Sequence, residues 1–147
     1  MDTLITILHV ATAVFIVGPM AIIPMTGLRA LRSGSAGQVR TLAKSATIFS
    51  WLSLVTFVLG FGAMGMAPAK YHLSFTTPWI LWSIILYVIA FVLSVFVAVP
   101  QMNKAADRLD QAPEGGAAAA GYGGIAASNG IAALLLVAVV VLMVWKP

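Results

Sequence analysis

Residues 78–100 read PWILWSIILYVIAFVLSVFVAVP, a run without a single Asp, Glu, Lys or Arg. A helix rises about 1.5 Å per residue, so about 20 apolar residues cross the hydrocarbon core of a bilayer. A helix also pairs its own backbone N–H and C=O groups, as lipid requires. The run therefore predicts a membrane-spanning helix, and Pro78 is well suited to its first turn.

Uncharged runs of at least this length recur along the chain. They cover residues 3–28, 45–69, 71–103 and 115–145. We expect one helix in each, over about residues 4–28, 45–69, 78–100 and 122–145. The sequence thus predicts an all-α fold, in which residues 1–147 form a single integral membrane domain, a four-transmembrane-helix bundle.

Composition narrows the class of protein further. The chain is 61% hydrophobic and 8% charged, whereas about 25% of the residues of a soluble domain are charged, so a water-soluble globule is excluded. The absence of cysteine excludes disulfides, thiolate-bound iron–sulfur clusters and thiol nucleophiles. No charged residue lies inside a predicted span, which argues against a proton relay or an ion pathway. We expect no catalytic activity and no bound cofactor.

The basic residues indicate how the bundle is oriented. The first connection carries four and no acid: Arg29, Arg32, Arg40 and Lys44. The third connection adds Lys104 and Arg108, whereas the other side holds Lys70 and Lys146. By the positive-inside rule we expect the first and third connections in the cytoplasm and both termini on the outer side.

The two basic connections differ in their expected structure. Ser33 to Gly37 predict a flexible elbow, whose cluster of basic residues could also contact anionic lipid. Nucleic-acid binding is not needed to explain so short a patch. Residues 101–111 favour a helix, so the third span is expected to protrude from the membrane and stop at Pro113. Lys104 and Arg108 would lie on one face of this extension, four residues apart.

His9 and His72 are the candidate cofactor ligands, because both are expected near the outer surface. Two imidazoles can hold a haem or a metal ion. Met64 and Met66 could complete a soft site for copper, although residues two apart do not share a helix face. The alternative interpretation is a hydrogen bond from His9 to another helix, with His72 at the membrane surface.

Prolines and small residues suggest how the helices pack. Pro19 and Pro24 predict a kink in the first helix, which would serve as a hinge, a ligand cavity or a static bend. Small residues with helix-packing spacing occur in the second and fourth helices: Gly60, Gly62, Gly65, Gly123, Ala127 and Gly130. Such faces allow close approach of helices within the chain or from another protein.

Four segments carry a resemblance to a known family. They are LHVATAVFIVG at 8–18, ALRSG at 30–34, TPWILWSIILYVIA at 77–90 and VPQMNKAADRL at 99–109. The chain resembles an uncharacterised family of small four-helix bacterial integral membrane proteins. It is similar to the actinobacterial members, and this likeness implies a link to accessory subunits of the cytochrome bcc/aa3-type oxidase supercomplex. The resemblance supplies no cofactor ligands.

Three functions are compatible with these observations. The first is a non-catalytic accessory or assembly subunit of a larger membrane complex in the bacterial plasma membrane, with respiratory oxidase components as partners. The second is a small haem- or copper-binding membrane protein that uses His9 and His72. The third is a channel or transporter for a neutral solute, formed by association of the kinked first helix.

Overall fold

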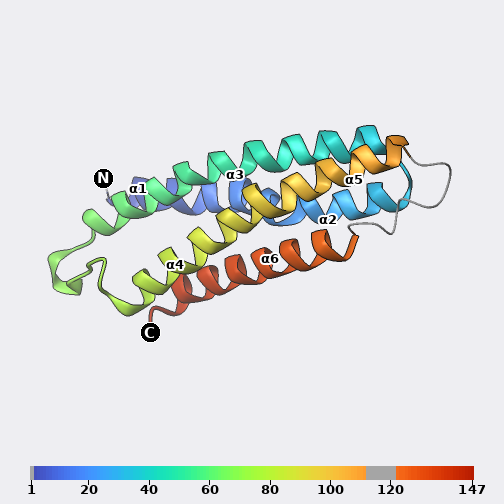
Figure 1. Ribbon diagram of the computed structural model, residues 1–147. Helices are drawn as coiled ribbons and strands as arrows, with labels where there is room; N and C mark the ends of the chain where they lie inside the picture. Colours follow the sequence, from blue (N-terminus) through green and yellow to red (C-terminus); the bar gives the residue numbers. More distant parts are fainter. Residues whose placement is uncertain (1, 112–121) are drawn as a thin grey trace.

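The computed structural model describes residues 2–111 and 122–147, in which helices form four long rods packed side by side (Figure 1). The first rod consists of α1 (Asp2–Thr12), the π-helical turn η1 (Ala13–Val17) and α2 (Gly18–Arg32). The second is α3 (Ala36–Gly65), the third is α4 (Pro78–Val92), η3 (Leu93–Ala98) and α5 (Val99–Gln111), and the fourth is α6 (Tyr122–Trp145). A short 3₁₀ turn, η2 (Ala69–Tyr71), lies between α3 and α4.

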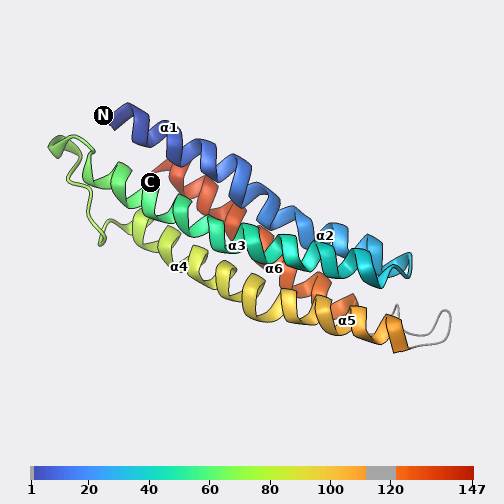
Figure 2. The same ribbon diagram turned by 90° about the horizontal axis from the view of Figure 1, so that it is seen from above.

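Each rod is long and apolar enough to cross a membrane, and the described residues contain no strand. The predicted all-α fold with four spans is therefore confirmed. Within the bundle, α3 lies between the first and third rods (Figure 2). The fourth rod, α6, packs against α2 and α4 and closes the bundle. Which end faces the cytoplasm stays a prediction from the charges.

The first connection differs from the expected flexible elbow. The second helix, α3, begins at Ala36 and ends at Gly65, instead of covering 45–69, and only Ser33 to Ser35 lie outside the helices in this connection. Gly34 adopts a φ of 77°, a left-handed conformation that glycine adopts without steric cost. The backbone N–H of Ser35 then donates to the carbonyl of Ala30, which closes a compact turn.

The third helix continues beyond residue 100 to Gln111, as its polar continuation predicted. The expected stop at Pro113 lies outside the described residues. The fourth helix occupies the expected range, from Tyr122 to Trp145.

The first and third rods are each interrupted by a π-helical turn, while the kink expected at Pro19 and Pro24 stays a prediction. The N–H of Gly18 donates to the carbonyl of Ala13, five residues back, and the N–H of Val99 donates in the same way to Ser94. A proline lies two residues after the end of each turn: Pro19 after Val17 and Pro100 after Ala98. Proline has no N–H and so cannot donate the helical bond to the carbonyl four residues earlier. The π-type hydrogen bonds lie in the turn that precedes each proline. Pro24 is buried within α2.

The tightest packing lies at the end of the bundle that carries the Ser33–Ser35 turn. Its core combines residues of α2, α3, α5 and α6, many of them alanines: Leu28, Ala30, Leu31, Ala36, Val39, Ala43, Ala46, Val99, Met102, Ala105, Ala106 and Ile125. Small side chains allow helices in lipid to approach closely, so that van der Waals contact holds them together. A second cluster around Met20, Tyr87 and Leu136 continues the core along the bundle.

Candidate functional site

The structure places His9 against the second rod. Its Nδ1 lies 2.9 Å from the backbone carbonyl oxygen of Thr56, so the tautomer with a proton on Nδ1 donates a hydrogen bond from α1 to α3. His72 follows η2, is exposed, and has a φ of 46°. Met64 is half-buried at the end of α3 and Met66 is exposed just after it. Within residues 2–111 and 122–147, no three His, Cys, Asp or Glu side chains gather in a way that could hold a metal ion.

Two of the glycines singled out from the sequence, Gly60 and Gly62 of α3, lie against side chains of the first rod. A Cβ added at Gly60 would lie 3.0 Å from Cε1 of His9, and one at Gly62 would lie 3.4 Å from Cγ2 of Ile5. By contrast, Gly65, Gly123 and Gly130 have no such neighbour. The lack of a side chain at Gly60 therefore lets α1 approach α3, whereas at Gly62 a Cβ would make an ordinary van der Waals contact.

Two further glycines make close contacts that the sequence analysis did not single out. A Cβ at Gly27 would meet the terminal methyl group of Met102, and one at Gly124 would lie 3.2 Å from Nε2 of Gln101. The available signal was weak, because Gly27 lies three residues after Pro24 on the buried face and Gly124 directly follows another glycine.

Hydroxyl groups form a polar seam inside the bundle that the sequence analysis also missed. Ser50, Ser53 and Thr56 are buried on α3 at intervals of three residues, a spacing that keeps them near one face of a helix. Ser53 donates to the carbonyl of Ser50 over 2.6 Å, so the Tyr87 hydroxyl, 2.6 Å from Ser53 Oγ, acts as the donor in that pair. The Tyr87 ring in turn stacks on Phe57.

A further buried polar side chain, Asn129 of α6, contacts the first rod. Its Nδ2 donates to the carbonyl of Ala21 over 3.5 Å, a long hydrogen bond. Its Oδ1, like Ser50 Oγ and Thr56 Oγ1, is buried without a hydrogen-bond partner in the part of the chain that the structure describes. Serine and threonine hydroxyls can rotate toward a carbonyl of the preceding turn. The oxygen of Asn129 has only acceptor capacity.

The four basic residues of the first connection do not form one cluster, because they lie on two helices and have different partners. Arg40 binds Asp107 over 2.7 Å and Asp110 over 2.6 Å, which ties α3 to α5. The hydrogen bond to Asp107, followed by that to Asp110, raises the pKa of the Arg40 guanidinium above its ordinary value. Arg32 lies over the ring of Tyr122 at 4.6 Å, a cation–π contact. Arg29 and Lys44 are exposed on α2 and α3.

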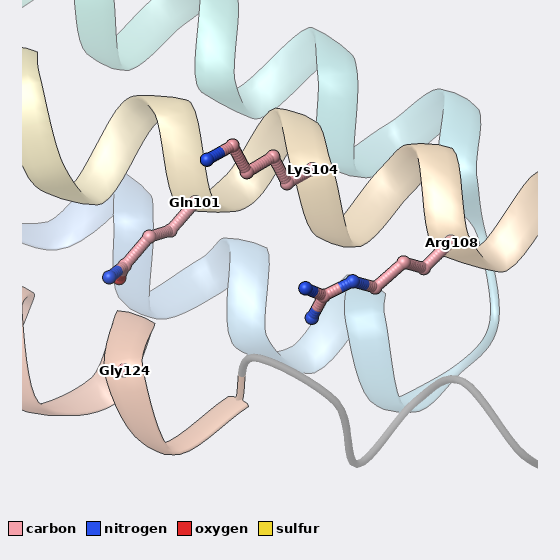
Figure 3. Close-up of a pocket in the computed structure, with 4 residues that line it drawn as sticks. All are labelled: Gln101, Lys104, Arg108 and Gly124. Atoms are coloured by element: carbon pink, nitrogen blue, oxygen red, sulfur yellow. The ribbon is translucent and has the colours of Figure 1, made fainter.

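A small pocket lies between α5 and the first turn of α6. It has a volume of about 240 Å³ and is lined by Gln101, Lys104, Arg108 and Gly124 (Figure 3). The three side chains come from one face of α5, since residues spaced by three and four lie above one another on a helix. Gln101 and Arg108 extend toward the side of α6, and Lys104 runs along α5 toward Gln101 (Figure 3). The pocket therefore combines two cations with an amide.

Four apolar spans and an all-helical fold define this chain as a multi-pass integral membrane protein. It belongs to the DUF2269 family, described as predicted integral membrane proteins, which matches residues 3–147. This match confirms that the chain is a member of an uncharacterised membrane family. Comparison with curated proteins and with solved structures finds no match.

Proposed function

We propose that the protein is a non-catalytic accessory or assembly subunit of a larger complex in the bacterial plasma membrane. The proposed host is the respiratory cytochrome bcc/aa3-type oxidase supercomplex. In this role the chain contributes helix surface to the complex, and the partner subunits carry the redox chemistry.

The observation that carries this proposal is the exposure of the first rod. In the 18-residue apolar segment of the first rod, only 6% of the residues are buried within the chain, against 28% in the corresponding segments of the third and fourth rods. Large apolar side chains cover its outward face: Leu4, Ile7, Leu8, Val10, Val14 and Phe15. Helices in lipid associate through van der Waals packing, and this face is broad enough for a helix of another subunit.

His9 supports ranking the haem or copper alternative below the accessory role. Its Nδ1 is already bonded to the Thr56 carbonyl, and its ring lies against Gly60. The ring therefore joins α1 to α3 and leaves Nε2 with a lone pair that can bind a metal, but no three His, Cys, Asp or Glu side chains gather around any point in the described residues.

The test is affinity purification of the tagged full-length chain in a mild detergent that keeps the oxidase intact. We expect oxidase and cytochrome subunits in the eluate, identified by mass spectrometry and by the visible absorption spectrum. Bulky substitutions on the exposed face of the first rod, Ile7→Trp with Val14→Trp, should remove them. The matched control is Val137→Trp with Val144→Trp, at exposed positions of α6. A chain that elutes alone, without oxidase subunits, would contradict the proposal.

A further inference from the structure

The pocket between α5 and α6 has the composition of an anion site. Gln101, Lys104 and Arg108 all line it from α5, with Gly124 of α6 opposite (Figure 3). We propose that this pocket binds the phosphate group of an anionic phospholipid headgroup. The inference is independent of the proposed accessory role, because it concerns the lipid that surrounds the chain and not a protein partner.

Within residues 2–111 and 122–147, the two cations of the pocket have no neutralising partner. Among the described residues, Lys104 and Arg108 have no acidic or aromatic partner, whereas Arg40 binds two aspartates and Arg32 covers Tyr122. An arginine guanidinium presents a planar fork of donors that matches phosphate oxygens, and a lysine ammonium adds a compact charge. The pair can therefore hold a singly charged phosphodiester.

Gln101 adds a neutral donor beside the charges. Ser128 Oγ lies 3.2 Å from the carbonyl oxygen of Ile125 and 3.4 Å from Gln101 Oε1, so its single proton is shared between these two acceptors, and both protons of Gln101 Nε2 remain to donate. The absence of a side chain at Gly124 keeps this amide next to α6, since a Cβ there would lie 3.2 Å from Nε2. The N-terminal end of α6 faces the same side and carries the positive end of the helix dipole. All of these groups favour a negative ligand.

The depth of the pocket identifies lipid as the source of the phosphate. Lys104 is the first charged residue after the uncharged run 71–103, just as Arg29 follows the run 3–28 and Lys44 precedes the run 45–69. The pocket thus lies at the edge of the apolar belt, at the level of lipid headgroups. Its volume of about 240 Å³ is below the roughly 300–1,000 Å³ of pockets for drug-sized ligands, so it accommodates a headgroup fragment while the acyl chains stay outside.

Native mass spectrometry of the full-length chain tests the proposal, with phosphatidylglycerol and phosphatidylcholine as the lipid probes. We expect preferential retention of phosphatidylglycerol. Lys104→Gln with Arg108→Gln should weaken that binding at least about tenfold, because each substitution removes a charge-assisted hydrogen bond to the phosphate. Arg29→Gln with Lys44→Gln removes the same charge from residues that do not line the pocket and should change the binding by no more than about threefold, as is usual for exposed charges.

A second pair of variants leaves the charge unchanged. Gly124→Leu places a side chain in the pocket and should abolish the preference for phosphatidylglycerol. Its neighbour Gly123 has open space around it, so Gly123→Leu should keep the preference. Circular dichroism of each variant checks that the helices are intact.

Three results would overturn the proposal. The first is equal retention of the two lipids by the unsubstituted chain. The second is an equal loss of binding in the two charge variants, or in the two glycine variants, since the pocket would then play no special part. The third is displacement of phosphatidylglycerol by inorganic phosphate at equal concentration, which would assign the site to free phosphate instead of a lipid headgroup.

Discussion

The two ends of the bundle are built differently. At the end with the Ser33–Ser35 turn, four helices bury Leu31, Val39 and Met102 completely, and Arg40 joins α3 to α5 through two aspartates. At the opposite end, α1 and η1 have no buried side chain among their described residues, and the connection after α3 is largely exposed. There the first rod meets α3 through the glycines and His9.

From this difference we infer that the end with the Ser33–Ser35 turn contributes most of the free energy of unfolding. Regions with few buried contacts open at lower free energy than a packed core. The first rod is therefore anchored by α2, while the contacts of its other half with α3 include the close approach of His9 to Gly60 and the hydrogen bond from His9 to the Thr56 carbonyl. The substitutions below test this division, beginning with the largest expected effect.

Met102→Ala should destabilise the chain most. The side chain is fully buried against α2, including Gly27, and truncation of a buried methionine costs about 2–5 kcal/mol of unfolding free energy. The matched change at the opposite end, Leu8→Ala, affects a side chain that is 42% exposed and should cost less than about 0.5 kcal/mol. Denaturation in mixed micelles, followed by circular dichroism, measures both. Equal losses would mean that the two ends are equally packed.

Gly60→Val should have the next largest effect, because the new side chain meets the His9 ring, which is fixed by its bond to Thr56. Overpacking of this kind costs about 1–3 kcal/mol. Gly65→Val lies on the same helix in open space and serves as the control. The same denaturation assay applies, and a Gly65 variant as unstable as the Gly60 variant would refute close packing of α1 on α3.

The hydrogen bond between Ser53 and Tyr87 should contribute less. In a double-mutant cycle of Ser53→Ala and Tyr87→Phe, we expect a coupling energy of about 0.6 kcal/mol and no more than about 1.7 kcal/mol, the range for such bonds within membranes. Ser83 bonds instead to Trp79 of its own helix. A cycle of Ser83→Ala with Tyr87→Phe should therefore be additive, and coupling there as strong as in the first cycle would contradict the assignment.

Arg40→Gln should give the smallest change. The ion pairs are exposed, and such pairs contribute little and weaken in salt. Because the folded chain raises the pKa of Arg40, any contribution is present below the ordinary pKa of the guanidinium and is lost only at strongly alkaline pH. The melting temperatures of the variant and the original chain should differ at low salt and agree at high salt. A difference that persists in high salt would show a role beyond the ion pair.

The sequence was sufficient to predict the four spans, because charged residues are excluded from the hydrocarbon core. It did not locate the start of α3 at Ala36, since Arg40 and Lys44 end the uncharged run without ending the helix. Helices continue into water as long as their backbone hydrogen bonds do, and only the polar Ser33–Ser35 turn interrupts this one. Charge marks the membrane boundary, not the helix boundary.

Side-chain partners were harder to predict than helices. The pairing of Arg40 with Asp107 depends on which rods are neighbours, and a sequence with four similar apolar runs does not specify that. His9 and the Gly60 region were both singled out, but their contact with each other required the register of α1 on α3. The pocket residues Lys104 and Arg108 were correctly placed on one face, whereas Gly124 opposite them was not recognised.

The two π turns also determine how a change in chain length would alter the bundle. Each contains one residue more than a regular turn, and one residue corresponds to about 100° of rotation along an α-helix. Deleting a residue from Ala13–Val17 would restore regular helix but rotate α1 relative to α2. His9 would then point away from Thr56. A related chain that lacks this extra residue must hold its first helix by a different face.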